Sequence, residues 1–198
     1  RLNTNNPPIK IAGSDISGST LKDYGMDGPI TAFQTNSNVY LYAPMRRGGR
    51  VAYAFDVTTA ATPTLLWKKG CPNAANDTDC SSGFSGMGQA WTSLKTMYAQ
   101  GYGAGASPLV VMGGGYDTCE DYDALTSGGK NHNCVAGLTL AGATVSGATT
   151  KGNKIYVMDA VTGALVQSFD TARSVIADVT LVLDANKKAK YGYTADMG

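Results

Sequence analysis

Two stretches of the chain are versions of one another, and this repeat limits the possible folds more than any other feature of the sequence. Residues 48–67 read GGRVAYAFDVTTAATPTLLW and residues 152–169 read GNKIYVMDAVTGALVQSF. Each has a glycine, a β-rich run that ends in aspartate, a turn and a second apolar run. With Asp56 aligned on Asp159, the pairs Gly49/Gly152 and Tyr53/Tyr156 coincide, and the pairs Thr62/Thr162 and Leu65/Leu165 coincide if the first turn is three residues longer. The sequence therefore predicts a repeated β-hairpin, and such repeats are typical of arrays whose units bury their apolar faces against their neighbours.

The repeating unit is larger than the hairpin, because two more β-rich runs precede each copy. These runs are residues 27–35 and 38–44 before the first copy, and 88–98 and 107–114 before the second. A third pair, 174–183 and 190–198, opens a further unit. Four-stranded meanders repeated around an axis are the blades of a β-propeller. We therefore predict an all-β fold, a partial β-propeller of about two and a half blades, with both ends of the sequence inside a larger repeat pattern.

The same pattern predicts the domain organisation. Residues 1–26 are polar and turn-rich, and we expect an irregular lead-in there. The propeller would occupy 27–198, with one blade at 27–70, a second at 86–170 that carries disulfide-stapled insertions, and a half blade at 174–198. The 25 glycines among 198 residues punctuate short apolar runs, and no stretch keeps a helical i, i+3, i+4 apolar pattern, so little helix is expected.

The charge and hydropathy of the chain exclude two classes of partner. A net charge of +1 argues against nucleic acid, which is bound by many clustered lysines and arginines. No apolar run approaches the roughly 20 residues that a membrane-spanning helix needs, so no membrane span is predicted in this segment. The one basic cluster, Arg46, Arg47 and Arg50, lies in a glycine-rich turn whose simplest interpretation is a solvated hairpin tip.

The four cysteines form two local pairs, Cys71 with Cys80 and Cys119 with Cys134. Neither pair has a C-x-x-C spacing, and the single histidine, His132, cannot supply a histidine-rich metal site. The spacing favours two disulfides, Cys71–Cys80 and Cys119–Cys134, over four buried free thiols. Disulfides persist outside the reducing cytosol, so we expect an extracellular protein that is exported through the periplasm.

Blade geometry predicts where these stapled loops lie. In an antiparallel four-stranded blade, the turn between the second and third strands leaves from the same end as the connection to the next blade. Both cysteine loops and the Arg46–Arg50 turn would then share one face. We expect this face to bind a ligand, and we expect the fold to survive replacement of residues 72–79 or 120–133 by short turns. The candidate binding residues are Arg46, Arg47, Asp77, Asp79 and His132.

An acidic cluster in the second cysteine loop is the candidate metal site. Its members are Asp117, Glu120, Asp121 and Asp123. Carboxylates so close together repel one another unless they are solvated or bridged by a cation, and oxygen ligands suit calcium. A calcium site and a solvated acidic loop both remain open, and no other cofactor is expected.

Catalytic motifs are absent from the sequence. Residues 83–87 read GFSGM and fail the G-x-S-x-G pattern, and the glycine-rich residues 101–105 precede a predicted strand, where a nucleotide-binding loop would open a helix. We therefore expect a protein that is not an enzyme.

The order of the motifs carries a resemblance to a known family. KDYGMDGPIT, GGRVAYAFDVT, LLW, GMGQAWTSLK, VVMGGGYD, GNKIYVMDAVTGALV and KYGYTADMG follow one another over roughly residues 22–198. This succession resembles the C-terminal propeller of the PilY/PilC family of type IV pilus-associated proteins. The resemblance implies a non-enzymatic protein at the cell surface or pilus tip that assists pilus assembly, opposes retraction and contributes to adhesion. The implied partners are pilin or minor pilins, a host-surface molecule and the remaining blades of the parent protein.

In that family, a loop between the first two strands of a blade binds calcium. The segment here that is similar to that loop is 182–190, in which only Asp184 and Asn186 could be ligands. Val182 and Lys190 take the outer ligand positions, and a lysine ammonium repels a cation. We therefore expect no calcium in this loop.

Two alternative functions remain open. One is a quinoprotein dehydrogenase, whose propeller encloses pyrroloquinoline quinone and calcium. That class needs a full ring, axial carboxylates and a disulfide between adjacent cysteines, and this sequence contains no Cys-Cys dipeptide. The other is a scaffold propeller of an envelope assembly complex. The stapled loops on one face favour a ligand-facing role over a purely internal one.

Overall fold

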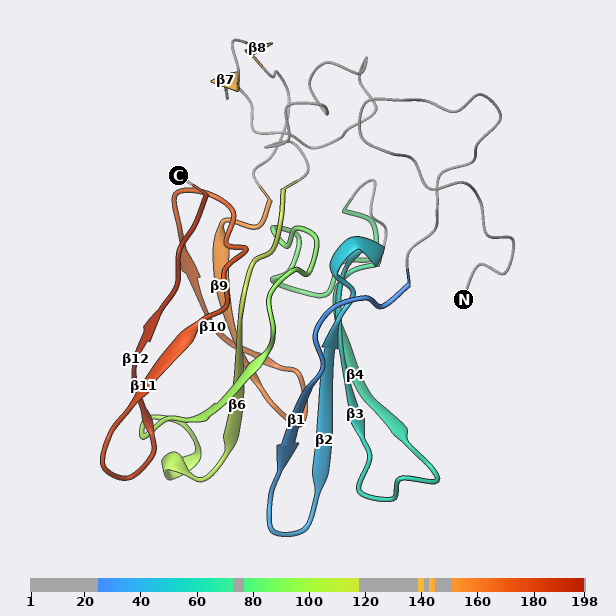
Figure 1. Cartoon of the computed structure of the whole chain (residues 1–198), viewed down its shortest axis with the longest axis vertical. Helices are drawn as coiled ribbons and strands as arrows, with labels where there is room; N and C mark the ends of the chain where they lie inside the picture. Colours follow the sequence, from blue (N-terminus) through green and yellow to red (C-terminus); the bar gives the residue numbers. More distant parts are fainter. Residues whose placement is uncertain (1–24, 73–76, 118–138, 141–142, 145–150, 198) are drawn as a thin grey trace.

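The computed structural model describes residues 25–72, 77–117, 139–140, 143–144 and 151–197 (Figure 1). These residues form an all-β structure built from antiparallel sheets. Helical structure within them is limited to two single turns of 3₁₀-helix, η1 (Arg46–Gly48) and η2 (Gly103–Gly105). No helix in this part of the chain is long and apolar enough to cross a membrane.

Two sheets have four strands each, as the repeat predicts. The first sheet runs in the order β1 (Thr31–Gln34), β2 (Val39–Pro44), β3 (Arg50–Asp56) and β4 (Thr64–Cys71). The second contains β5 (Lys95–Tyr98), β6 (Pro108–Gly113), β9 (Lys154–Asp159) and β10 (Leu165–Asp170), again as a meander. A two-stranded sheet pairs β11 (Thr180–Leu183) with β12 (Ala189–Tyr193), and another pairs β7 (Thr139–Leu140) with β8 (Ala143–Thr144).

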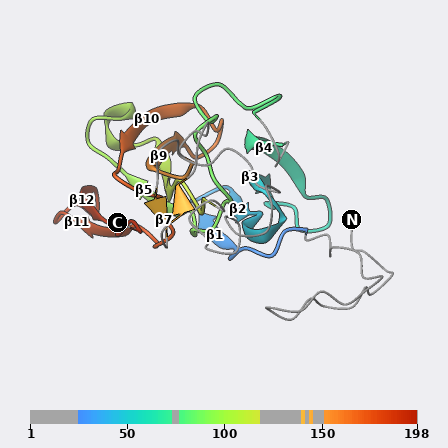
Figure 2. The same cartoon turned by 90° about the horizontal axis from the view of Figure 1, so that it is seen from above.

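The three main sheets follow one another in space in the order of the sequence. Figures 1 and 2 both show the second sheet between the first sheet and the β11–β12 hairpin. Face-to-face succession of four-stranded meanders is the architecture of a β-propeller. The predicted partial β-propeller, with two four-stranded units and the first two strands of a third, is therefore confirmed.

The main core lies between the first and second sheets. Tyr42, Ala54 and Trp67 from the first sheet and Met112 and Tyr156 from the second are among its buried members. A single carbonyl, that of Ala160 in the β9–β10 turn, accepts hydrogen bonds from Tyr42 Oη and Trp67 Nε1, both at 3.1 Å. These bonds satisfy two aromatic polar groups that would otherwise be buried without partners.

Gly163 is required where Trp67 crosses this turn. Its φ of +67° lies in the left-handed region, and a Cβ atom there would stand 2.7 Å from the nearest atom of the Trp67 ring. The Thr162-Gly163 turn of the second hairpin therefore needs glycine at position 163, both for its backbone conformation and for the close approach of the first sheet.

The third strand of the second unit, β9, packs against a different neighbouring unit on each of its two faces. Ala52 and Ala54 of β3 belong to the core against the second sheet, and side chains alternate along a strand, so Tyr53 points away from that sheet. In β9 the equivalent Tyr156 packs in the core with the first sheet. Val157 packs instead in a second core with Val179, which precedes β11. The second unit therefore contacts the first and the third unit through opposite faces.

The repeated aspartates close the third-to-fourth-strand turns. Asp56 Oδ1 accepts the backbone N–H of Thr58 at 2.8 Å. Asp159 Oδ1 accepts the backbone N–H groups of Val161 and Thr162, at 3.0 and 2.7 Å. An aspartate that binds the backbone two residues ahead stabilises a tight turn, which explains why both copies of the hairpin carry one.

One strand differs from the sequence prediction, and the two tryptophans differ in their surroundings. The run 88–98 forms a strand only over Lys95–Tyr98, because Gln89 makes an isolated bridge with Tyr116 instead. Trp67 lies in the core between the first two sheets. Trp91, which lies before β5 begins, is only partly buried, and its ring lies 5.6 Å from that of Tyr116.

The packing predicts a large difference between two leucines. Leu94 is fully buried in the main core, whereas Leu65 is 55% exposed. Leu94→Ala should lower the free energy of unfolding by about 3 kcal/mol, through lost burial and a residual cavity. Leu65→Ala should cost under about 1 kcal/mol. Urea unfolding of both variants checks this, and equal losses would contradict the assignment of the core.

Candidate functional site

The connections between strands gather at one end of the sheets, which we call the loop-bearing end. It holds the β2–β3 turn (45–49), the β4–β5 connection and the described ends of the β6–β9 connection, all at the top in Figure 1. The turns β1–β2, β3–β4 and β11–β12 lie at the opposite end. The expected convergence of the turns between second and third strands with the connection to the next unit is therefore present in the residues that the structure describes.

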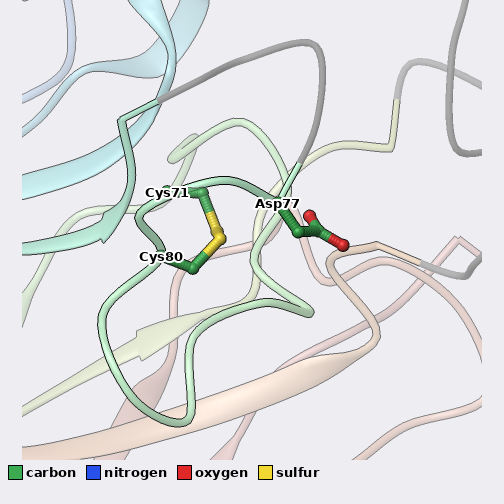
Figure 3. Close-up of side chains that lie close together, drawn as sticks. All are labelled: Cys71, Asp77 and Cys80. Carbon is green, nitrogen blue, oxygen red and sulfur yellow. A yellow bond between two sulfur atoms is a disulfide. The ribbon is translucent and has the colours of Figure 1, made fainter.

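The disulfide Cys71–Cys80 is formed, as predicted, and ties the end of β4 to the following connection. The second predicted bridge, Cys119–Cys134, lies outside the described residues. Figure 3 shows Asp77 beside the first bridge, with its carboxylate and the two sulfurs within 4.8 Å of one another. Because both sulfurs are joined in the disulfide, neither is a thiolate, and this group is not a metal centre.

Asp77 pairs with two buried cations, one in the first sheet and one just before the second. Its Oδ1 accepts a hydrogen bond from Arg50, at the start of β3, at 2.9 Å. Its Oδ2 lies 2.7 Å from Nζ of Lys151, which precedes β9. Both cations also donate to the carbonyl of Ser85, at 2.8 and 2.9 Å. We call Arg50, Asp77, Ser85 and Lys151 the Asp77 cluster.

Ion pairs within the Asp77 cluster link the two sheets. Arg50 and Lys151 are each only 5% exposed, and a buried charge is costly unless it is paired and hydrogen-bonded. Burial acts to raise the pKa of Asp77, but the hydrogen bonds and charges of Lys151 and Arg50 outweigh it and hold the pKa below its usual value. Asp77 is therefore ionised near neutral pH and balances charge contributed by both sheets.

The predicted calcium ligands are only partly described. Asp117 is buried, and its Oδ2 accepts the backbone N–H of Lys151 at 3.2 Å. Glu120, Asp121 and Asp123 lie outside the described residues. A calcium ion at this acidic cluster therefore stays a prediction, in which Asp117 would be a ligand that also orders the backbone beside the Asp77 cluster.

The three arginines of the basic turn have different surroundings. The guanidinium carbon of Arg46 lies 4.7 Å from the centroid of the Trp91 ring, within the range of a cation–π interaction. Arg47 pairs with Asp27 through its backbone N–H, at 3.0 Å, and its side chain, which remains 50% exposed. The interpretation of this turn as a solvated tip is wrong for Arg50, which is buried in the Asp77 cluster.

The loop-bearing end brings together Arg46, Arg47, Asp77 and Asp79 of the predicted binding residues, whereas His132 lies outside the described residues. Sequence reasoning missed Arg50 and Lys151 as structural partners of Asp77. A signal was present for Arg50, because it opens the apolar strand RVAYAFD. The expectation that residues 72–79 can be replaced without cost to the fold conflicts with the position of Asp77.

Asp184, the possible ligand in the segment 182–190, lies at the opposite end of the molecule. Its Oδ1 accepts the backbone N–H groups of Asn186 and Lys188, at 2.8 and 2.9 Å. The carboxylate thus closes the β11–β12 turn. That this loop binds no calcium remains a prediction.

No protein-family profile matches the chain, and no curated protein is significantly similar to it in sequence. Among solved structures, it is similar to the crystal structure of the C-terminal domain of Pseudomonas aeruginosa PilY1, with 18% sequence identity and a TM-score of 0.49. The alignment covers 83% of this chain and 26% of that one, so the chain spans about a quarter of the PilY1 chain in that structure.

The Asp77 cluster predicts an unequal effect of two substitutions in one loop. Asp77→Asn keeps the shape of the side chain but removes the charge that pairs with Arg50 and Lys151. We expect a loss of about 3 kcal/mol in the free energy of unfolding, near the lower end for breaking a buried ion pair because Asp77 is 38% exposed. Asp79→Asn, at an exposed position two residues away, is the matched control and should change stability by less than about 0.5 kcal/mol. Equal melting temperatures for the two variants would contradict the claim that the charge of Asp77 stabilises the fold.

The lowered pKa of Asp77 also predicts how stability depends on pH. A carboxyl with a lower pKa in the folded state stabilises the fold above its unfolded pKa, near 4, and loses this effect as pH falls through the folded pKa. The stability difference between the wild type and Asp77→Asn should therefore be full at pH 6–7 and shrink below about pH 4. Urea titrations across this range measure it. A difference that stays constant down to pH 2 would show that the charge of Asp77 is not the cause.

Proposed function

We propose that the chain is part of a non-enzymatic, pilus-associated surface protein that binds a protein partner through the loop-bearing end. The ordered motifs that resemble the PilY/PilC family support this proposal. The Cys71–Cys80 bridge is consistent with export to an oxidising compartment, and we place the protein at the cell surface or pilus tip.

The observation that carries the proposal is the anchoring of the loops. Connections from both four-stranded sheets meet at one end, and the disulfide and the Asp77 cluster fix the β4–β5 connection to both sheets. A surface held in place before binding loses little conformational entropy when a partner docks. Loops that are ordered by a rigid scaffold are a common location for binding.

The chemistry of this end fits recognition of a protein surface. It offers the exposed carboxylate of Asp79, the half-exposed guanidinium of Arg47 and the partly exposed ring of Trp91 under Arg46. Charges of both signs beside an aromatic side chain are typical of protein interfaces. We propose pilin, a minor pilin or a host-surface molecule as the partner.

Two substitutions at the loop-bearing end test the proposal, each with a matched control at the opposite end. Arg47→Glu reverses an exposed charge, and Ser82→Arg adds bulk to the β4–β5 connection. Lys187→Glu and Ser37→Arg make the same changes in the β11–β12 and β1–β2 turns. Purified pilin and minor pilins serve as binding probes, and pilus display and adhesion are measured with the variants placed in the parent protein.

We expect the loop-bearing-end variants to weaken binding or adhesion about tenfold, as disruption of an interface anchor does, and the controls to behave as wild type. Circular dichroism and thermal melting verify that all four variants fold. Wild-type binding and adhesion by both folded loop-bearing-end variants would refute this end as the working surface.

A further inference from the structure

A stack of three side chains lies at the loop-bearing end, where the first unit meets the second. The guanidinium carbon of Arg46 is 4.7 Å from the centroid of the Trp91 ring. The ring of Tyr116 is 5.6 Å from that of Trp91, with 48° between the ring planes. All three side chains are partly exposed. We call them the Arg46 stack, and they are of the residue types most enriched at the energetic centres of protein interfaces.

Backbone hydrogen bonds hold the stack in place. The N–H of Arg46 donates to the carbonyl of Ala90 at 2.9 Å, and the N–H of Ala90 donates back to the last carbonyl of the β2–β3 turn at 3.0 Å. Gln89 exchanges two backbone hydrogen bonds with Tyr116, both at 2.8 Å. These two residues directly precede Trp91, so the segment that carries the ring is bonded to both of the other members. The stack is therefore formed before a partner docks, and docking orders few further groups.

The backbone conformation at position 46 favours glycine. The φ of Arg46 is +54°, in the left-handed region, which is unfavourable for a residue with a Cβ atom. Residues in such conformations cluster at ligand-binding sites, where the side chain has a role that outweighs the strain. The turn alone therefore does not explain an arginine here, and the role of its side chain does.

The charges of the three arginines in this turn are balanced differently. Asp27 pairs with Arg47, and Asp77 pairs with Arg50. No carboxylate among the described residues forms an ion pair with Arg46, which lies on the Trp91 ring instead. Stacking uses the flat face of a guanidinium and leaves its in-plane N–H groups able to donate two parallel hydrogen bonds to one carboxylate.

We propose that the Arg46 stack binds an acidic side chain, aspartate or glutamate, of the protein partner, with the carboxylate paired bidentately to the Arg46 guanidinium. This inference rests on the function proposed for the loop-bearing end and names the chemistry that the partner presents there. Because Asp27 cancels the charge of Arg47, one positive charge remains, which fits a monoanionic carboxylate better than a phosphate dianion. The Trp91 ring carries a cation on one face, so its role is to position Arg46 rather than to stack on a sugar.

Two capped tripeptides that differ in a single charge serve as probes: acetyl-Gly-Glu-Gly-amide and, as the control, acetyl-Gly-Gln-Gly-amide. The side-chain Nε–Hε resonance of Arg46 and the Nε1–Hε1 resonance of Trp91 report binding in isotope-labelled protein. The titrations are run at low ionic strength, where exposed charges are screened least. We expect the glutamate peptide to shift both resonances saturably and the glutamine peptide to bind about tenfold more weakly or worse.

Two glycine substitutions separate recognition from structure. Arg46→Gly removes the guanidinium and relieves the left-handed strain. Lys187→Gly makes the same change at a φ of +59° in the turn at the opposite end, and is the matched control. We expect Arg46→Gly to weaken the peptide-induced shift of Trp91 about tenfold or more, while its melting temperature stays within about 3 °C of the wild type, because glycine suits the backbone there. Lys187→Gly should bind the peptide as the wild type does.

A third variant tests the bidentate geometry. Arg46→Lys keeps the charge and loses the planar pair of donors, so it should bind the glutamate peptide about threefold more weakly or worse. Binding by this variant as tight as that of the wild type would overturn the pairing.

Four other results would overturn the proposal. The first is a glutamate-peptide titration that does not saturate, and the second is equal binding of the two peptides. The third is a larger fall in melting temperature for Arg46→Gly than the limit above, because Arg46 would then be a structural residue. The fourth is tighter binding of inorganic phosphate or glucuronate than of the glutamate peptide, since the ligand would then not be a protein side chain.

The proposed function is judged separately. If the glutamate peptide binds at Arg46 but Arg47→Glu and Ser82→Arg retain wild-type pilin binding and adhesion, the loop-bearing end is refuted as the working surface and the carboxylate site stands. If those two variants lose binding but the glutamate peptide does not bind, the carboxylate site is refuted and the proposed function stands.

Discussion

The face-to-face packing of one sheet on the next is the interaction on which the rest of the structure depends. A four-stranded sheet alone would leave both faces exposed, and here the second unit buries one face against the first unit and the other against the third. The Ala160 carbonyl, shared by Tyr42 and Trp67, fixes the position of the second hairpin on the first sheet.

Ion pairs stabilise the same interface at the loop-bearing end, beyond the hydrophobic core. Arg50 begins β3 of the first sheet, Lys151 lies just before β9 of the second, and both are buried. A single carboxylate in a disulfide-closed loop pairs with both. A buried ion pair is weak evidence for net stability, but removing one member is costly because the others remain buried. The cluster therefore gives the loop-bearing end a defined geometry, on which the proposed binding role rests.

The sequence predicted the features whose signals are local or repeated. The hairpins were visible because their aspartates close equivalent turns, and the Cys71–Cys80 bridge because its cysteines are close in sequence. The Asp77–Lys151 pair was not visible, since 74 residues separate its members and only the docking of the two sheets brings them together. The strand predicted around Trp91 was wrong because Gln89 bridges to Tyr116, a contact that β-propensity does not reveal.

The sequence positions of the Asp77 cluster impose an order on its assembly. Asp77 lies 27 residues after Arg50 and 74 residues before Lys151. During synthesis from the N-terminus, Asp77 emerges soon enough to pair with Arg50 while the second sheet is still incomplete, and the shorter separation also costs less loop-closure entropy. Lys151 joins only when β9 docks on the first sheet. The first unit can thus neutralise the charge of Arg50 early. Lys151 stays hydrated until the two sheets dock, so docking is the step that forms the Asp77–Lys151 ion pair.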